Sequence, residues 1–327
     1  MTLRSECTPL PEGRPVMVVG GRGFVGSHVV RALVEAKLRP VLFGPPMAED
    51  RLSDIAGRYG EITGSIEDRE RVEAALEQVR PWAVVSCAAH GVGRLGLMRS
   101  GEAEPDAAMA VNVLGLGKLL DAARRAGVTR VVWTSSTVVY GPASAYPREP
   151  VNEDDRTAPT TFYGLTKVLA EELARYHTRR HGLDIIGLRL PLIVGPGLWY
   201  RGAAHGLADL FDAVRQGAPA RIAFHDSPVD LMHVADAAEA ILTVLRHPGP
   251  LGQIYNVEGF KARLTDLVCE IGRVRPGARI EVEPMAAAVL FPLIDGSRFR
   301  VATGFTARHD LARSVRTMLE DRKEMAP

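Results

Sequence analysis

The chain has 327 residues, of which 46% are apolar and 24% charged, a composition typical of one large globular domain or two intimately joined ones. Forty basic residues against thirty-nine acidic ones give a formal net charge of +1, so the chain lacks the positive field that drives binding to nucleic acid or to an anionic membrane. Cys7, Cys87 and Cys269 lie far apart without a C-x-x-C pair, which argues against a disulfide framework and a metal site and favours a reducing cytoplasm.

The first fifteen residues are interpreted as a flexible, polar leader. They contain Arg4, Glu6, Glu12 and Arg14, so they lack the apolar run of a signal peptide, and no later segment approaches an apolar span of about twenty residues. We therefore expect a protein of the cytoplasm that has no membrane partner.

Residues 16–190 alternate between β-branched runs and helical patterns. The predicted strands are 16–19, 40–43, 61–63, 83–87, 130–134 and 184–190, and the predicted helices are 24–36, 67–79, 105–126 and 162–181. Strands that alternate with helices predict an α/β fold, with a doubly wound parallel sheet of the Rossmann type covered on both faces. We assign residues 16–190 to a dinucleotide-binding domain.

The alternation breaks after Pro191 into turns rich in Gly and Pro. Residues 191–220 and 258–327 are predicted to form a smaller substrate-binding lobe, while segments near 221–257 return to the first domain. The predicted elements in this part are the helices 203–216 and 236–246 and the strands 221–224 and 254–257. Asp236 opens a helix and is expected to be its N-cap, so Asp236 and the nearby His233 are interpreted as structural.

A G-x-x-G-x-x-G motif at residues 20–26 joins the first predicted strand to the first predicted helix. Glycines let the backbone turn tightly and approach a pyrophosphate, whose charge is met by the N–H groups at the start of the helix. An ordinary tight connection is the alternative, but the strand–helix units that follow favour a dinucleotide. The residues expected to bind the cofactor here are Gly20, Arg22, Gly23, Phe24, Val25 and Gly26.

The choice of nicotinamide cofactor depends on the end of the second strand. NAD sites usually place there an acidic residue for the ribose 2′-OH, but this chain has Phe43-Gly44-Pro45. Arg22 could bind a 2′-phosphate as a bidentate donor, although a solvated surface arginine is the alternative. The sequence therefore favours NADP over NAD without excluding NAD.

Tyr163 and Lys167 lie four residues apart, on one face at the start of the predicted helix 162–181. A neighbouring ammonium stabilises a phenolate and lowers the pKa of the phenol, which makes proton transfer feasible at neutral pH. Ser136 follows the strand 130–134 at the sheet edge where α/β proteins collect their ligands, so its hydroxyl could hold a substrate oxygen. Ser136 alone is more simply a turn cap, but together the three residues favour catalysis.

Six segments together resemble the extended short-chain dehydrogenase/reductase family, including its NAD-dependent epimerase/dehydratase group. They are Val18-Val19-Gly20-Gly21-Arg22-Gly23-Phe24-Val25-Gly26-Ser27-His28, Ser86-Cys87-Ala88-Ala89, Asn112-Val113-Leu114-Gly115, Thr134-Ser135-Ser136-Thr137-Val138-Val139-Tyr140-Gly141, Tyr163-Gly164-Leu165-Thr166-Lys167 and Leu188-Arg189-Leu190-Pro191-Leu192-Ile193-Val194-Gly195-Pro196.

The resemblance implies that Ser136, Tyr163 and Lys167 are the catalytic triad and that Lys167 also holds the nicotinamide ribose. It also implies a homodimer formed through the helices 105–126 and 162–181. The further cofactor contacts that it implies are Ser65, Ile66, Ala88, Ala89 and Pro191.

Two positions depart from the members of that family that act on nucleotide sugars. Leu192 stands where they usually carry Asn, and Val229 stands where they usually carry Arg. The loss of an amide and a guanidinium removes charge-assisted contacts to a diphosphate, so we expect a small polar substrate without a nucleotide. The weak candidates for the substrate pocket are His90, Arg94, Thr137, Leu192 and Trp199, with Arg94 as partner of an anion, although each is also explained by packing or solvation.

These observations predict an NAD(P)-dependent oxidoreductase that interconverts a secondary alcohol and a ketone. A nucleotide-sugar epimerase or dehydratase, in which hydride transfer is transient, is the first alternative. A non-catalytic protein that senses NAD(P) is the second, and the Tyr163–Lys167 pair argues against it because a sensor has no need of a phenol beside an ammonium.

Overall fold

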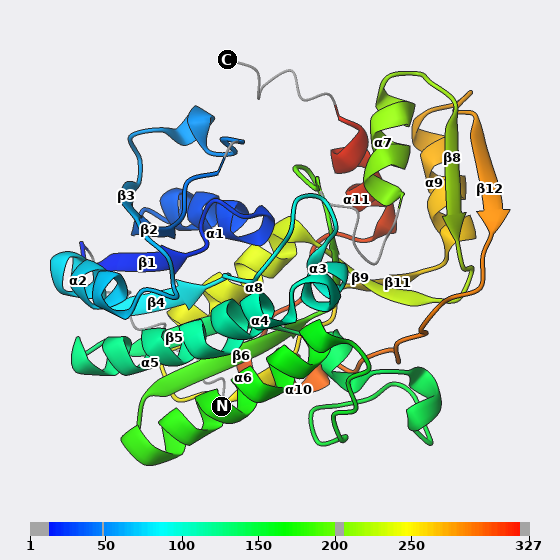
Figure 1. Cartoon of the computed structure of the whole chain (residues 1–327). Helices are drawn as coiled ribbons and strands as arrows, with labels where there is room; N and C mark the ends of the chain where they lie inside the picture. The colour runs from blue at the N-terminus through cyan, green and yellow to red at the C-terminus, as the bar shows by residue number, and fades with distance from the viewer. Residues whose placement is uncertain (1–12, 48, 200–205, 321–327) are drawn as a thin grey trace, which may run out of the picture.

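The computed structural model describes residues 13–47, 49–199 and 206–320, and its centre is a seven-stranded sheet (Figure 1). The strand order is β10-β6-β5-β4-β1-β2-β3, and every neighbouring pair is parallel. The predicted doubly wound parallel sheet is therefore confirmed. Its strands are β1 (Pro15–Val19), β2 (Arg39–Gly44), β3 (Gly60–Thr63), β4 (Ala83–Ser86), β5 (Arg130–Ser136), β6 (Asp184–Leu190) and β10 (Ile254–Asn256). The predicted leader, 1–15, falls outside the described residues except for 13–15.

Helices cover both faces of this sheet because successive side chains of a strand point to opposite sides. Val16 and Val18 of β1 pack with α1 (Phe24–Glu35) and α8 (Val234–Arg246) in one apolar cluster. Met17 and Val19 pack into a second cluster on the other face, which is covered by α2 (Arg69–Val79), α5 (Leu116–Arg125) and α6 (Phe162–His181).

The segment predicted as one helix, 105–126, is divided in three. It forms α4 (Pro105–Met109), the π-helical turn η2 (Ala110–Gly115) and α5, and it is preceded by α3 (Leu97–Ala103), which the sequence did not predict. A Cβ at Gly115 would lie 2.8 Å from Ile66, so the widened turn accommodates a close contact between η2 and the segment after β3. π-turns are rare and often mark functional sites.

Most of the chain after β6 forms a smaller lobe beside the seven-stranded sheet (Figure 1). A three-stranded sheet has the order β11-β9-β7, and β8 and β12 form a separate parallel pair. Their apolar side chains share one cluster with three helices. The elements are β7 (Leu192–Val194), β8 (Ala220–Phe224), β9 (Val229–His233), β11 (Phe260–Ala262), β12 (Ile280–Pro284), α7 (Leu207–Arg215), α9 (Leu264–Val274), α10 (Ser297–Thr303) and α11 (Leu311–Leu319).

Among the segments expected to return to the first domain, α8 and β10 do contact or join the large sheet, whereas β8 pairs with β12 outside it. The division into two domains stays a prediction. Part of the predicted helix 203–216 lies outside the described residues, and the described part begins at Leu207. In the described ranges no helix combines the length and the apolar character needed to cross a bilayer.

The predicted N-cap role of Asp236 is wrong. Helix α8 begins two residues earlier, and His233 caps it by accepting a hydrogen bond at Nδ1 from the N–H of Ala235. Asp236 instead accepts hydrogen bonds from the N–H groups of Arg308 and His309, at 3.1 and 2.9 Å, and so fastens the C-terminal segment to α8.

Candidate active site

The glycine motif forms the tight turn between β1 and α1. Gly20 adopts φ 76° and donates its N–H to the carbonyl of Phe43, while Gly23 donates to the carbonyl of Gly20. A Cβ at Gly26 would lie only 2.1 Å from the Gly20 oxygen, and a Cβ at Gly20 would lie 2.9 Å from the nitrogen of Ala88. Only glycine fits these two positions without displacing backbone.

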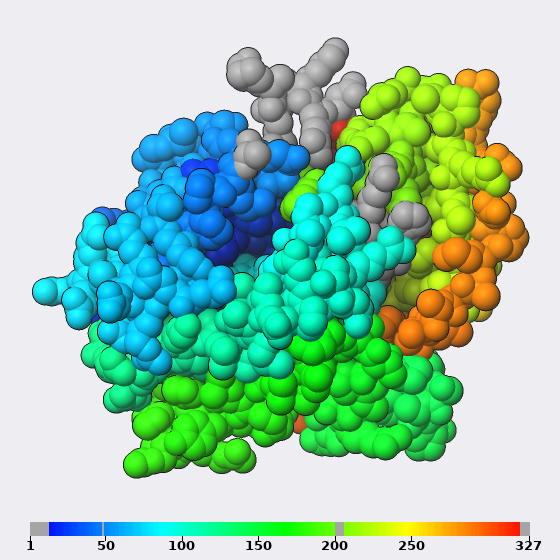
Figure 2. All heavy atoms as spheres, in the orientation of Figure 1, coloured from blue at the N-terminus to red at the C-terminus, as the bar shows by residue number. Residues whose placement is uncertain are grey.

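The start of α1 is suited to an anion. Gly23 is its N-cap and supplies no side-chain hydrogen bond, and the first turn carries no acidic residue. The N–H groups of that turn and the positive end of the helix dipole therefore face the space above the glycines. Phe24 is buried in the core, so its backbone and not its ring is available there. Figure 2 shows a hollow in this face, between the blue glycine turn and the cyan segment after β4. These features fit the pyrophosphate of a dinucleotide.

The remaining predicted cofactor residues follow the carboxyl ends of neighbouring strands. Ser65 and Ile66 come after β3, and Ile66 is buried while Ser65 accepts a hydrogen bond from the N–H of Glu67. Ala88 and Ala89 follow β4, and the backbone of Ala88 lies next to Gly20. Pro191 is buried directly after β6. The sheet thus brings all of them to the edge where parallel α/β folds bind ligands.

Arg22 is engaged by carboxylates. Its Nε and Nη2 donate to the two oxygens of Glu61 at 2.6 and 2.5 Å, and its Nη1 lies 3.5 Å from Asp50. The hydrogen bonds with Glu61 raise the pKa of the guanidinium. Arg22 therefore does not present a free fork to a 2′-phosphate, and this contact removes the observation on which the sequence-based preference for NADP rests.

Tyr163 and Lys167 lie in the first turns of α6. Thr161 caps this helix by accepting a hydrogen bond from the N–H of Gly164 at 3.0 Å, which fixes where the helix begins. The Nζ of Lys167 lies 5.5 Å from the centre of the Tyr163 ring and donates to the carbonyl of Thr134 at 2.7 Å. Both side chains are buried, at 7% and 3% exposed. Burial lowers the pKa of Lys167 to about 8, against the opposing influence of Cys87 and Glu171.

Ser136 ends β5, two residues after the carbonyl that holds Lys167. Its Oγ accepts a hydrogen bond from the N–H of Val138 at 3.4 Å and so caps the short 3-10 helix η3 (Thr137–Tyr140). The capping role considered from the sequence is thus present. Because the hydroxyl proton is not used in that bond, it remains able to donate to a substrate oxygen. The structure brings the end of β5 and the start of α6 to one edge of the sheet.

Comparison with known proteins decides the family. The family model for the NAD dependent epimerase/dehydratase family matches residues 16–257. This chain belongs to that family. The resemblance to the extended short-chain dehydrogenases/reductases is confirmed, and the chain is an NAD-dependent enzyme of that group.

Relatives with two different activities are similar to this epimerase/dehydratase family member. A UDP-glucose 4-epimerase from Rhizobium leguminosarum bv. trifolii is 30% identical over 249 residues, which cover 70% of this chain and 71% of the relative. The mitochondrial L-threonine 3-dehydrogenase of Bos taurus is 30% identical over 228 residues, which cover 67% of this chain and 60% of the relative.

Solved structures share the fold along most of the chain. A partial consensus L-threonine 3-dehydrogenase is 25% identical with a TM-score of 0.83, covering 95% of this chain and 99% of its own. A Thermus thermophilus UDP-glucose 4-epimerase, solved with NAD, is 24% identical with a TM-score of 0.81. The match covers 94% of this chain and 98% of the epimerase chain.

The predicted substrate residues of this family member are only partly brought together. Arg94, in the segment after β4, donates its Nε to the carbonyl of Trp199 at 3.0 Å, and its Nη2 lies 3.8 Å from Asp209 of α7. His90 donates its N–H to Asn112 and lies 3.1 Å from Glu104. Thr137 begins η3, and Leu192 lies opposite Leu231 in the smaller sheet. Their roles in substrate binding stay predictions.

Asn112 of the π-turn η2 supports the site, although the sequence analysis gave it no role. It is buried, accepts the N–H of His90 at 2.8 Å, and donates to Oγ1 of Thr166 at 3.0 Å, next to Lys167. A buried amide within the apolar run Ala110-Val111-Asn112-Val113-Leu114 was the available signal. The contact of the Thr134 carbonyl with Lys167 could not be predicted from the sequence, because every residue has a backbone carbonyl.

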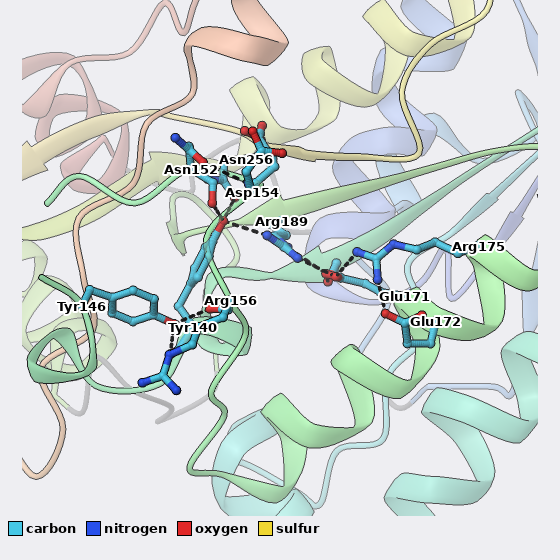
Figure 3. A network of polar contacts seen from close by, with 12 residues as sticks. Tyr140, Tyr146, Asn152, Asp154, Arg156, Glu171, Glu172, Arg175, Arg189 and Asn256 are labelled. Carbon is cyan, nitrogen blue, oxygen red and sulfur yellow. Dashed lines mark hydrogen bonds and ion pairs between the residues drawn. The ribbon is translucent and has the colours of Figure 1, made fainter. Parts of the chain in front are cut away.

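A network of polar contacts with a buried centre at Glu171 and Arg189 joins α6 to β6 (Figure 3). Glu171, one turn after Lys167 on α6, accepts two hydrogen bonds from Arg189 of β6, at 2.9 and 2.6 Å, and one from Ser135 of β5 at 2.7 Å. Arg189 also donates to the hydroxyl of Tyr140 at 2.7 Å. Burial raises the pKa of Tyr140 to about 12, so its phenol stays neutral. The network fastens α6, which carries Tyr163 and Lys167, to β5 and β6.

Proposed function

We propose that this chain uses NAD(P) to interconvert a secondary alcohol and a ketone on a small polar substrate without a nucleotide. The observation that carries the proposal is the buried ammonium of Lys167, 5.5 Å from the centre of the Tyr163 ring. An ammonium that is buried without a hydrogen-bonded carboxylate is costly. Lys167 has the Thr134 carbonyl as its hydrogen-bond acceptor and lies over the rings of Tyr163 and Trp133, an arrangement best explained by its influence on the Tyr163 phenol.

Each member of the proposed triad has a distinct role. Ser136 donates its hydroxyl proton to the substrate oxygen and holds it at the end of β5. Tyr163 takes the proton from the alcohol, or returns it to the ketone, and Lys167 stabilises the phenolate that this exchange requires. The nicotinamide, when bound, accepts or donates the hydride.

The substrate class is inferred from side chains near the end of β6 and in the smaller sheet. Leu192 and Val229 pack against the apolar cluster of the smaller sheet and offer no hydrogen-bond donor to a diphosphate. Relatives named L-threonine 3-dehydrogenase support a small hydroxy acid as the substrate. Arg94, more than half exposed and already bonded to the Trp199 carbonyl, remains the proposed partner of the acid group.

A nucleotide-sugar epimerase is the second candidate, because UDP-glucose 4-epimerases are among the similar proteins. In that reaction the hydride returns to the sugar and the cofactor does not change. A role limited to sensing NAD(P) would leave the Tyr163–Lys167 pair without a purpose.

We also propose a homodimer formed through the predicted helices 105–126 and 162–181, which are α4, η2 and α5 on one side and α6 on the other. Three large side chains of α6 are 38–54% exposed, and Leu114 of η2 is 55% exposed. Apolar side chains gathered on one helix face favour contact with a second copy. The three on α6 are Leu165, Leu169 and Tyr176. The cytoplasm remains the proposed location, and the free thiols of Cys87 and Cys269 are compatible with its reducing conditions.

A substrate panel tests the proposed reaction. Purified protein is given either NAD or NADP with L-threonine, other hydroxy acids, polyols or sugars, and formation of the reduced nicotinamide is followed by absorbance. We expect net reduction with at least one small hydroxy acid and none with UDP-glucose. Conversion of UDP-glucose to its 4-epimer, detected by chromatography without net reduction, would contradict the proposal and support the epimerase.

A further inference from the structure

We infer that Glu61, assisted by Asp50, makes this enzyme select NAD over NADP by holding Arg22. The inference rests on the proposed binding of the dinucleotide at the glycine turn, and it names the residue that determines cofactor specificity there.

Arg22 and Glu61 meet across the end of β2. Arg22 belongs to the turn after β1, whereas Glu61 belongs to β3, where it is in register with Leu42 of β2. In folds of this type the adenosine ribose lies at the end of the second strand, close to the glycine turn. That strand ends here with Gly44, which has no carboxylate. Glu61 thus brings a carboxylate to this region from the neighbouring strand.

The contact between Arg22 and Glu61 is bidentate and partly shielded from water. The two donor–acceptor distances are 2.6 and 2.5 Å, and the side chains are 21% and 35% exposed. Paired N–H donors that face two carboxylate oxygens form one of the stronger charged contacts in proteins. A 2′-phosphate can use the same donors only if this contact breaks.

Nearby arginines are matched by carboxylates as well. Arg31 pairs with Asp54, and Arg51 pairs with Glu49. Asp50, 3.5 Å from Arg22, is a fourth carboxylate beside three guanidinium groups. A 2′-phosphate, with a charge of about −2, would therefore meet a region without excess positive charge. The 2′-hydroxyl of NAD carries no charge and can donate to a carboxylate.

The test is the binding of oxidised NAD and NADP to the full chain, measured by isothermal titration calorimetry without substrate. We expect the wild type to bind NAD more tightly than NADP. Glu61→Gln should raise the affinity for NADP relative to NAD by about tenfold, since it breaks the bidentate contact with Arg22 and removes a negative charge. Asp50→Asn should shift the ratio in the same direction by a smaller factor.

Two further variants separate this explanation from a general effect of charge. Glu73→Gln removes one carboxylate of similar exposure on α2, where Glu73 pairs with Arg125, and it should leave the ratio unchanged. Adding Arg22→Ala to Glu61→Gln should abolish most of the gain for NADP.

Three results would overturn the inference. They are a wild type that binds NADP at least as tightly as NAD, a Glu61→Gln ratio that moves no more than that of Glu73→Gln, and a gain that survives the loss of Arg22. Absence of binding of either dinucleotide to the folded wild type would instead refute the proposed cofactor site, and the inference with it.

Discussion

At the scale of single residues, the proposed chemistry depends most on Lys167. Its ammonium is buried and hydrogen-bonded to the carbonyl of Thr134, and burial lowers its pKa to about 8. Below that pH the side chain is mostly cationic and can stabilise the Tyr163 phenolate. Above it the amine is mostly neutral and the stabilisation is lost.

This titration predicts how the effect of removing the amine depends on pH. Lys167→Met should lower kcat/KM for alcohol oxidation by about 100-fold or more at neutral pH, the range expected for loss of support to a general base. The ratio of wild-type to variant kcat/KM should shrink as the pH rises through about 8, because the wild type then loses the same charge. Profiles of kcat/KM against pH measure this, and a ratio that stays constant to high pH would contradict the proposed role.

At this scale the sequence indicated candidate residues by their type and spacing, but it did not indicate the contacts that these residues make. The glycine motif and the spacing of Tyr163 and Lys167 stand out in the sequence because the proposed chemistry requires those residue types at those positions, and their roles stay predictions. The bidentate hold of Glu61 on Arg22 joins residues 39 positions apart, so no local pattern could indicate it. The N-cap of α8 was assigned to Asp236 and not to His233 because the sequence placed the helix start two residues late.

At the scale of elements, α6 is fastened to β5 and β6 through Glu171. This carboxylate is 2% exposed and its partner Arg189 is 1% exposed, so neither charge can be solvated if the other is removed. Breaking such a pair leaves a buried uncompensated charge, which costs about 3–5 kcal/mol.

A substitution that breaks this buried pair should therefore lower the stability of the folded protein. Arg189→Met should lower the free energy of unfolding by about 3 kcal/mol or more, measured by urea denaturation. Arg175→Met is the matched control, because Arg175 also faces Glu171, at 3.5 Å, but is 26% exposed, and it should cost less than about 1 kcal/mol. Equal losses of unfolding free energy for the two variants would show that the buried Arg189–Glu171 pair stabilises the fold no more than the exposed Arg175–Glu171 pair.

The alternation of strands and helices was predictable because β-branched runs and apolar helical periodicity are local properties. The break of the predicted helix 105–126 was not, because the π-turn η2 depends on the contact of Gly115 with Ile66, which is distant in sequence. The short helix α3 was missed because its apolar residues are few, and its Gly101 packs against the backbone of Tyr163.

At the scale of the whole molecule, α6 leaves an apolar face exposed in the described fold of the single chain. Leu165 and Leu169 are one turn apart, and both point away from the core. A second copy that covers this face would bury them.

The dimer proposal predicts that a charge on this face separates the copies. Leu169→Glu should convert the dimer to a folded monomer, measured by size-exclusion chromatography with light scattering, because a carboxylate would be buried without a partner. Val301→Glu, at an 86% exposed position on α10, is the control and should remain dimeric. A wild type that is monomeric at high concentration would refute the dimer.

The most direct test of the central claim is the effect of removing one hydroxyl group. With the substrate identified by the panel, Tyr163→Phe should lower kcat by about 100-fold or more, while the affinity for the nicotinamide cofactor stays near that of the wild type. Tyr176→Phe, on the same helix but 54% exposed, should keep full turnover. A Tyr163→Phe enzyme that turns over at the wild-type rate would show that Tyr163 does not transfer the proton.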